Sequence, residues 1–282
     1  MADLERLVAI SRRYGADRDF VIAGGGNTSY KDGGRMWVKA SGVALADIDA
    51  SGFVEMDLQA LRAIVDSDFG PNPDQREARF KDAIYACRWR PELGQRPSVE
   101  CAVHALFPHR YVVHTHATYA NMVSCCVRGE ELCRELFGGE VVWVPYTDPG
   151  FLLAKSIAER LQGRDASQPV AMLWQNHGFV VAAETPDQID AWTERLLSRV
   201  RGIVPPLPAA GPEPNDEVLW RLLPRLRGAL LSRGWGSIVR CRTTGPGRVF
   251  ADHPDARRLT AMGPLIPDQI VYCKSFPLWL NP

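Results

Sequence analysis

The sequence has no excess of charge of either sign, because 33 lysine and arginine residues balance 33 aspartate and glutamate residues. A balanced chain lacks the general electrostatic attraction that binds nucleic acid or an anionic membrane surface. We therefore expect neither as a partner, and any anion must be bound by a local arrangement of groups. No stretch approaches the roughly 20 apolar residues that cross a bilayer, and the charged N-terminal segment lacks the apolar core of a signal peptide. These absences predict a cytoplasmic protein.

The sequence also lacks any CxxC pair, and its seven cysteines are odd in number. This usage argues against a disulfide framework and against a zinc site made of thiolates. The cysteines are therefore expected to be reduced and mostly buried.

Short patterns along the chain predict a mixture of helices and strands. Apolar residues at helical spacing predict helices over residues 2–14, 58–65, 77–88, 98–107 and 186–203. β-rich runs predict strands over residues 20–23, 111–116 and 141–144, and two hairpins, one from 24–29 into 36–39 and one joining 171–174 to 179–182. Because the strict alternation of a doubly wound sheet is missing, we predict a layered α/β or α+β domain with much antiparallel pairing.

A proline-rich segment over residues 205–216 is typical of a linker. It divides the chain into a larger domain over residues 1–204 and a small C-terminal α/β extension over residues 217–282. The extension is predicted to contain a helix over 218–233 and strands near 237–241, 249–251 and 269–274.

Three histidines are candidate metal ligands. His114 and His116 stand two residues apart in an apolar β-rich run, so strand alternation directs both imidazoles to one face. His177 lies at the tip of a predicted hairpin, where the backbone can bend to bring in a third nitrogen. Three imidazoles suit zinc and leave a position open for substrate. A single strand histidine is more often a satisfied core or surface group, but the combination of three favours a metal site.

Glu100 and His104 share one face of the predicted helix that precedes these histidines. Beside a metal, Glu100 could act as a general base and acid, with its pKa raised by a dry pocket. The alternative is a glutamate in the first turn that the helix dipole stabilises, with Ser98 as the cap. His104 could be a fourth ligand, a partner of a ligand or a structural residue.

Three short loops offer small polar side chains and backbone N–H groups that could converge on an anion. They are Gly26-Asn27-Thr28, Ser41-Gly42 and Pro97-Ser98. Each loop by itself is an ordinary turn signal. The glycine run lacks the spacing of a dinucleotide site and the lysine of a P-loop.

Six motifs follow one another in a specific order: GGGNTS, VKASG, PSVECAVH, VVHTHA, PYTDPG and NHGFVV. With this set the sequence resembles the class II aldolase/adducin family over roughly residues 4–203. The C-terminal run GPLIPDQIVYCKSFPLWL is more loosely similar to the end of the aldolase part of bifunctional rhamnulose-1-phosphate aldolase/alcohol dehydrogenase proteins.

The resemblance implies a three-layer α/β/α fold around a mainly antiparallel sheet, assembled as a homotetramer. It implies that His114, His116 and His177 bind Zn²⁺ or another divalent metal and that Glu100 is the acid/base. The substrate phosphate would be bound by Asn27, Thr28, Ser41, Gly42 and Ser98. Tyr146 falls where the tyrosine of a neighbouring subunit protonates the aldehyde in some aldolases.

The implied activity is cleavage of a ketose 1-phosphate or related sugar to dihydroxyacetone phosphate and an aldehyde through a metal-stabilised enediolate. One departure concerns the phosphate, because Val99 stands where aldolases of the family have a second serine. Lys39 either compensates by its charge or points to solvent. The alternatives are a sugar-phosphate dehydratase, epimerase or decarboxylase on the same metal site, and a non-catalytic adducin-like binding module.

Overall fold

The computed structural model describes residues 2–206, 208, 216–236, 238–241 and 243–279. The chain divides into two compact units. The first contains Met1–Ile203 together with the short segment Leu265–Asp268, and the second contains Val204–Pro264 and Gln269–Pro282. Most of the predicted linker lies outside the described residues. No described helix is long and apolar enough to cross a membrane.

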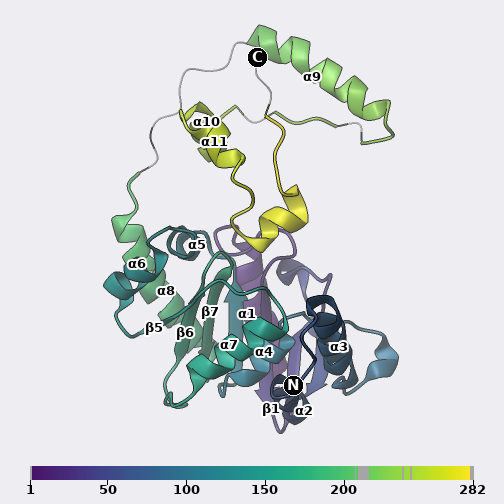
Figure 1. Ribbon diagram of the computed structural model, residues 1–282, viewed down its shortest axis with the longest axis vertical. Helices are drawn as coiled ribbons and strands as arrows, with labels where there is room; N and C mark the ends of the chain where they lie inside the picture. The colour runs from purple at the N-terminus through teal and green to yellow at the C-terminus, as the bar shows by residue number, and fades with distance from the viewer. Residues whose placement is uncertain (1, 207, 209–215, 237, 242, 280–282) are drawn as a thin grey trace. The chain divides into compact units, whose positions relative to one another are not determined.

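A seven-stranded sheet forms the centre of the first unit (Figure 1). Its strands are β1 (Asn27–Asp32), β2 (Arg35–Lys39), β3 (Phe53–Asp57), β4 (Tyr111–Thr115), β5 (Val141–Val144), β6 (Val170–Trp174) and β7 (Gly178–Ala183). The order across the sheet is β3-β2-β1-β4-β7-β6-β5, with every pair antiparallel except β5 and β6. Both predicted hairpins are present, and the mainly antiparallel sheet is confirmed.

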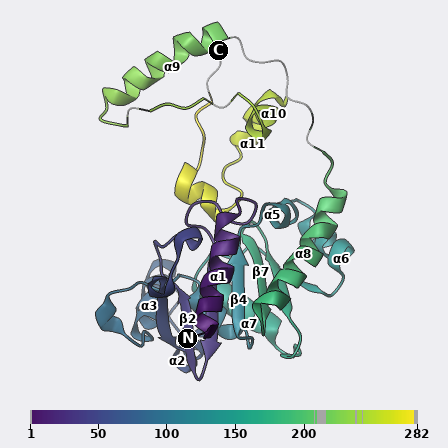
Figure 2. The ribbon, with the colours of Figure 1, turned by 180° about the vertical axis from the view of Figure 1, so that it is seen from behind.

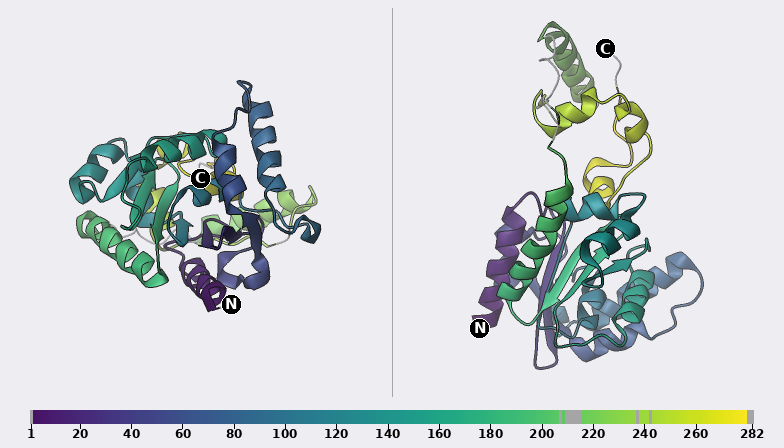
Figure 3. Two further views of the ribbon diagram at one scale, coloured as in Figure 1. Left: turned by 90° about the horizontal axis from the view of Figure 1, so that it is seen from below. Right: turned by 90° about the vertical axis from the view of Figure 1, so that its left-hand side faces the viewer.

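Helices cover both faces of this sheet, which confirms the three-layer arrangement (Figures 2 and 3). One face carries α1 (Ala2–Ala16), α5 (Thr118–Ser124), α6 (Gly129–Phe137) and α8 (Pro186–Ile203). The other face carries α2 (Leu58–Val65), α3 (Pro73–Ala86), α4 (Cys101–Leu106) and α7 (Phe151–Leu161). Each helix buries an apolar stripe against the sheet or a neighbouring helix.

Strand alternation decides which side chains meet which helices. Val112 in β4 and Val180 in β7 belong to the buried cluster on the α2, α4 and α7 side. His114 follows Val112 by two residues, so it points to the same side. Asn27 is paired with His114 across β1 and β4 and therefore shares that face.

Two predictions for the first unit differ from the structure. Residues 20–23, predicted as a strand, form turns and irregular backbone, with Ala23 in the left-handed region (φ 54°). β3 was not predicted, although it pairs along its whole length with β2. The apolar run over residues 20–23 does not form a strand because it pairs with no described strand. In contrast, β3 forms a strand because it pairs with β2.

The described part of the second unit contains helices and no strand. They are α9 (Asp216–Leu231), α10 (Pro246–Asp252), α11 (Ala256–Thr260) and a π-helical turn (Gln269–Cys273). The predicted helix over 218–233 is therefore present as α9. The strands predicted near 249–251 and 269–274 are wrong, and residues 238–241 of the third are irregular, with Ser237 outside the described residues. Apolar runs this short fit a helix as well as a strand.

Candidate metal centre

The three predicted histidines come together at one end of the sheet. His114 lies in β4, His116 lies just beyond the end of that strand, and His177 lies in the turn between β6 and β7. One ring nitrogen from each forms a group whose members are all within 4.8 Å of one another. The Nε2 atoms of His114 and His116 are 3.1 Å apart. This spacing suits nitrogen ligands that share one ion.

His114 is held with one nitrogen free for a ligand. Its Nδ1 lies 3.2 Å from the carbonyl oxygen of Phe179, and its ring stacks on Trp174 at 4.6 Å between centroids. A proton on Nδ1 donates to this carbonyl and leaves the Nε2 lone pair toward the other histidines. Burial lowers the pKa of His114 well below its ordinary value. A neutral imidazole is the form that binds a metal, so the donor set fits a divalent ion.

Gly178 keeps the space that the histidines need. A Cβ at this position would lie 2.7 Å from Cε1 of His114 and 2.9 Å from Cδ2 of His116. These distances are too short for carbon atoms in contact. The turn that carries His177 can approach β4 only because residue 178 has no side chain.

Gly178→Ala is therefore expected to push the histidine rings apart and to weaken metal binding. The overpacking should also lower the free energy of unfolding by about 1–3 kcal/mol. Urea unfolding and metal titration would measure the two effects. Gly139→Ala is the control, since a Cβ at Gly139 meets no atom within 4 Å. Equal metal affinity in Gly178→Ala and Gly139→Ala would contradict this packing argument.

Glu100 is buried beside the histidines, at the N-cap position of the following helix, but its carboxylate does not cap that helix. The helix α4 begins at Cys101, three residues later than predicted, and the Glu100 side chain makes no capping hydrogen bond. Its Oε1 lies 2.9 Å from Nε2 of His177, and its Oε2 accepts a hydrogen bond of 2.7 Å from Nδ2 of Asn27. The carboxylate therefore faces the cluster through contacts with His177 and Asn27.

The pKa of Glu100 moves in the direction opposite to our prediction. Burial raises it, as expected for a dry pocket, but His114, His177 and the hydrogen bond from Asn27 together hold the pKa well below its usual range. The lowered pKa favours the carboxylate form, which is the form that can accept a proton from a substrate.

His104 does not belong to the cluster. Among the described residues, the group of candidate metal ligands contains His114, His116 and His177. Its Nδ1 is 2.8 Å from Oγ of Ser29, and the side chain is completely buried. Burial, and to a smaller extent the charge of Lys31, lowers the pKa of His104 from 6.5 to about 3. It is therefore a neutral core residue at neutral pH, the structural alternative among those considered for it.

His104 should make the protein less stable in acid. The unfolded chain protonates this residue below pH 6.5, while the folded chain resists until about pH 3. Its contribution to stability is therefore complete above pH 6.5 and is lost as the pH falls from 6.5 towards 3, at about 1 kcal/mol per pH unit. Urea unfolding between pH 4 and 7, with a chelator present, should show a shallower slope for His104→Gln than for the unsubstituted protein. Identical slopes would contradict the assignment.

Two of the three predicted anion loops lie against each other, and Asn27 of the third bonds to Glu100 beside them. Ser41 donates from its backbone to the carbonyl oxygen of Arg96 and from its Oγ to that of Pro97, while the N–H of Ser98 donates to Lys39. Ser98 in turn accepts the N–H of Glu100 with its Oγ, at 3.4 Å. Gly42 has a positive φ of 88°, which opens the loop beside Arg96. The loops thus form one polar wall next to Glu100.

The structure decides the placement of Lys39, which the sequence left open, and places the side chain of Thr28 away from where the resemblance implies. Lys39 is buried rather than pointing to solvent, and its charge interacts with that of Glu100. Thr28 faces the opposite side of the sheet, where its hydroxyl bonds to Ser11 at 2.6 Å. Strand alternation explains this, because Asn27 and Ser29 take the face of the cluster. Thr28 is therefore not brought to the site by its side chain.

The side chain of Tyr146 makes no described contact with the histidine cluster. It is 60% exposed, and its hydroxyl donates to Asp148 at 3.0 Å. This hydrogen bond raises the pKa of Tyr146.

Asp268 and Trp174 both contact the candidate ligands, and sequence reasoning missed both. Oδ2 of Asp268 lies 2.7 Å from Nδ1 of His116, and Trp174 stacks on His114. Asp268 is far from the histidines along the chain, and only its place in the C-terminal run similar to family members could have drawn attention to it. Trp174 lies in an apolar run that predicts only a buried strand.

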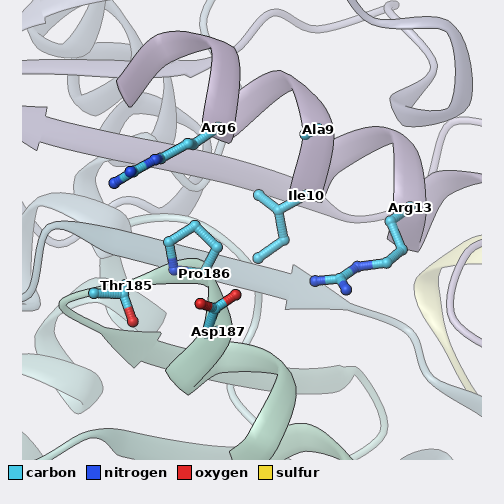
Figure 4. Close-up of a pocket in the computed structure, with 7 residues that line it drawn as sticks. All are labelled: Arg6, Ala9, Ile10, Arg13, Thr185, Pro186 and Asp187. Carbon is cyan, nitrogen blue, oxygen red and sulfur yellow. The ribbon is translucent and has the colours of Figure 1, made fainter. Parts of the chain in front are cut away.

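A separate surface pocket lies between α1 and the start of α8 (Figure 4). It is lined by Arg6, Ala9, Ile10, Arg13, Thr185, Pro186 and Asp187. The two arginines already have partners, since Arg13 pairs with Asp190 and Arg6 lies 3.6 Å from Asp3. None of the predicted site residues lines this pocket.

The fold and the three-histidine cluster agree with a family model. The model described as Class II Aldolase and Adducin N-terminal domain matches residues 5–198. The chain therefore belongs to the class II aldolase and adducin family. The match ends before the C-terminal residues, so Asp268 lies outside it.

Three relatives illustrate the extent of the similarity. The uncharacterized oxidoreductase YuxG of Bacillus subtilis (strain 168) is 29% identical over 302 residues, which cover 99% of this chain but 42% of that protein. This chain thus spans less than half the length of that relative. The N-terminal class II aldolase domain of a conserved protein from Thermoplasma acidophilum has a TM-score of 0.63 and 27% identity over 72% of this chain and 94% of that chain. YgbL from Escherichia coli, a putative aldolase/epimerase/decarboxylase, has a TM-score of 0.50 and 20% identity over 72% of this chain and 88% of that chain, which shows a shared fold.

Proposed function

We propose that this protein is a zinc-dependent aldolase that cleaves a ketose 1-phosphate or a related sugar to dihydroxyacetone phosphate and an aldehyde. The observation that carries the proposal is the convergence of His114, His116 and His177 beside the buried carboxyl group of Glu100. Three nitrogen ligands leave a coordination position for substrate, as in catalytic zinc sites. Membership of the class II aldolase and adducin family supports the same chemistry.

In this proposal, the three histidines hold the ion and Glu100 moves the proton. When bound, a divalent ion supplies Lewis-acid stabilisation for the negative charge that develops on the substrate oxygens as the C–C bond breaks. In the direction of aldol addition, the carboxylate of Glu100 removes the proton from the carbon that forms the new C–C bond, and in cleavage the protonated carboxyl returns the proton to that carbon. Asn27 holds the carboxylate of Glu100 in place through its 2.7 Å hydrogen bond.

The polar wall formed by the three loops is proposed to bind the phosphate. Ser41, Gly42 and Ser98 contribute small groups, and the buried Lys39 contributes positive charge near the position that Val99 leaves without a hydroxyl. Burial lowers the pKa of Lys39, while Glu100 opposes this shift. Fixing the phosphate would fix the reacting carbons relative to Glu100.

A homotetramer is proposed for the assembled enzyme, with Tyr146 of one copy reaching the site of a neighbour. Its exposed position supports such a role. In the direction of aldol addition, the hydroxyl of this tyrosine would donate its proton to the aldehyde oxygen, while Glu100 takes up the proton removed from carbon. Light scattering on the purified protein would test the assembly.

The proposal is tested by metal analysis of protein purified without added zinc, followed by a panel of ketose 1-phosphates on the same sample. We expect about one zinc per chain and release of dihydroxyacetone phosphate from one member of the panel. Zinc without release from any ketose would reject the aldolase in favour of a dehydratase, epimerase or decarboxylase. Absence of a bound metal would reject the enzyme in favour of a binding module.

A further inference from the structure

A short segment from near the C-terminal end of the chain lies against the histidine cluster. Leu265–Asp268 is part of the first compact unit, although the rest of the chain beyond Ile203 is not. The carbonyl oxygen of Leu265 accepts hydrogen bonds from Nδ2 of Asn176, at 3.1 Å, and from Sγ of Cys125, at 3.6 Å. The first of these donors is the residue immediately before His177. The segment is thus anchored on the turn that carries a candidate ligand.

This anchoring places Asp268 on the outer nitrogen of His116. Oδ2 of Asp268 is 2.7 Å from Nδ1 of His116, while Nε2 of the same ring faces Nε2 of His114 at 3.1 Å. Both side chains are largely buried, with 8% of His116 and 10% of Asp268 exposed. The contact has ion-pair distance but not hydrogen-bond geometry, and neither of the two atoms makes another hydrogen bond to a described residue. A proton on Nδ1, with the carboxylate aligned to accept it, would leave the Nε2 lone pair directed into the cluster.

The glycine run is shaped to admit this carboxylate. A Cβ on Gly25 would lie 2.8 Å from Oδ1 and 2.9 Å from Oδ2 of Asp268. Gly25 is not among the residues with positive φ, so its backbone alone does not require glycine. The room that it leaves is occupied by Asp268. Two segments more than 240 positions apart in the sequence are therefore fitted to each other at His116.

We propose that Asp268 is a positioning residue that fixes the tautomer and the orientation of His116 as a metal ligand. His114 has the carbonyl oxygen of Phe179 for the same purpose. Because Asp268 lies beyond the residues that the family model matches, the segment Leu265–Asp268 completes a site whose ligands belong to the matched domain. The inference rests on the metal centre of the proposed function. Loss of such an outer partner weakens metal binding by about 10- to 100-fold.

The test is a Co²⁺ titration of the full-length protein against a competing chelator, followed by visible absorption. We expect Asp268→Ala to bind Co²⁺ about 10- to 100-fold more weakly than the unsubstituted protein, and Asp268→Asn to lie between them because it keeps a hydrogen-bond acceptor. Circular dichroism should be unchanged. Asp255→Ala is the control, since it removes an exposed carboxylate paired with Arg258.

A double-substitution cycle gives an independent readout. Gly25→Ala should weaken Co²⁺ binding in the natural background, because the new methyl group displaces the Asp268 carboxylate. In the Asp268→Ala background, Gly25→Ala should weaken Co²⁺ binding only slightly. The effects of the two substitutions on Co²⁺ affinity should therefore not be additive. Full additivity would overturn the inference.

Two further outcomes separate this inference from the function on which it rests. Tight Co²⁺ binding by the unsubstituted protein, with equal affinity in Asp268→Ala, would overturn the positioning role and leave the metal centre intact. An altered Co²⁺ coordination number in Asp268→Ala would also overturn it, since Asp268 would then be a ligand itself. Absence of Co²⁺ binding by the unsubstituted protein would overturn both.

Discussion

His177→Ala is expected to abolish metal retention and activity together. Only two imidazoles would remain, and the fall in metal affinity should exceed the roughly 100-fold that loss of an outer partner costs. His177 is the most informative ligand to remove, because it lies in a turn and leaves the contact between His116 and Asp268 untouched. Metal content after gel filtration and dihydroxyacetone phosphate release would measure the two effects.

The matched control for this experiment is His253→Ala. His253 is exposed and lies in the second unit, outside the three-histidine group. It should retain the metal and the activity of the unsubstituted protein. A His177→Ala protein with a full complement of metal and normal activity would remove His177 from the proposed ligands.

Glu100→Gln is expected to separate proton transfer from metal binding. The amide has nearly the shape of the carboxylate and can still accept the hydrogen bond from Asn27, but it cannot take up a proton. Metal content should therefore be unchanged, while exchange of the enolisable proton of dihydroxyacetone phosphate should slow by about 10²- to 10⁴-fold. Nuclear magnetic resonance in D₂O follows this exchange directly.

Glu131→Gln serves as the control for Glu100→Gln. The Glu131 side chain is 45% exposed and pairs with Arg128 at the surface of α6. Its replacement should leave both metal content and exchange unaltered. Normal exchange in Glu100→Gln would show that another group carries the proton, and loss of metal would show that the carboxylate is needed to hold the ion.

Together, the two substitutions test different parts of one arrangement. His177 and Glu100 are in direct contact, with 2.9 Å between Nε2 and Oε1. A purely structural contact would make both variants lose the same properties. The proposed roles instead require that one variant loses the metal and that the other keeps it.

Sequence patterns of short range determined much of the fold. The helices over residues 58–65 and 186–203 have the predicted bounds, and both hairpins form where alternation of apolar residues and turn residues places them. His114 and His116 also meet as predicted, although His116 lies just beyond the end of β4, so the period of the strand accounts only for His114. The patterns failed over residues 249–251 and 269–274, since a short apolar run becomes a strand only beside another strand.

The tertiary structure alone decided how the site is assembled. The order β1-β4-β7 in the sheet places Asn27 and the turn with His177 on either side of His114, and no local period encodes that order. The direction in which the pKa of Glu100 shifts depends on which charges and donors surround the carboxylate. The prediction of a raised pKa, which considered only burial, was therefore wrong. Asp268 reaches His116 from the far end of the chain. The sequence by itself determined which residue types could bind a metal, whereas contacts between distant segments decided how each is oriented, because those contacts depend on packing rather than on spacing.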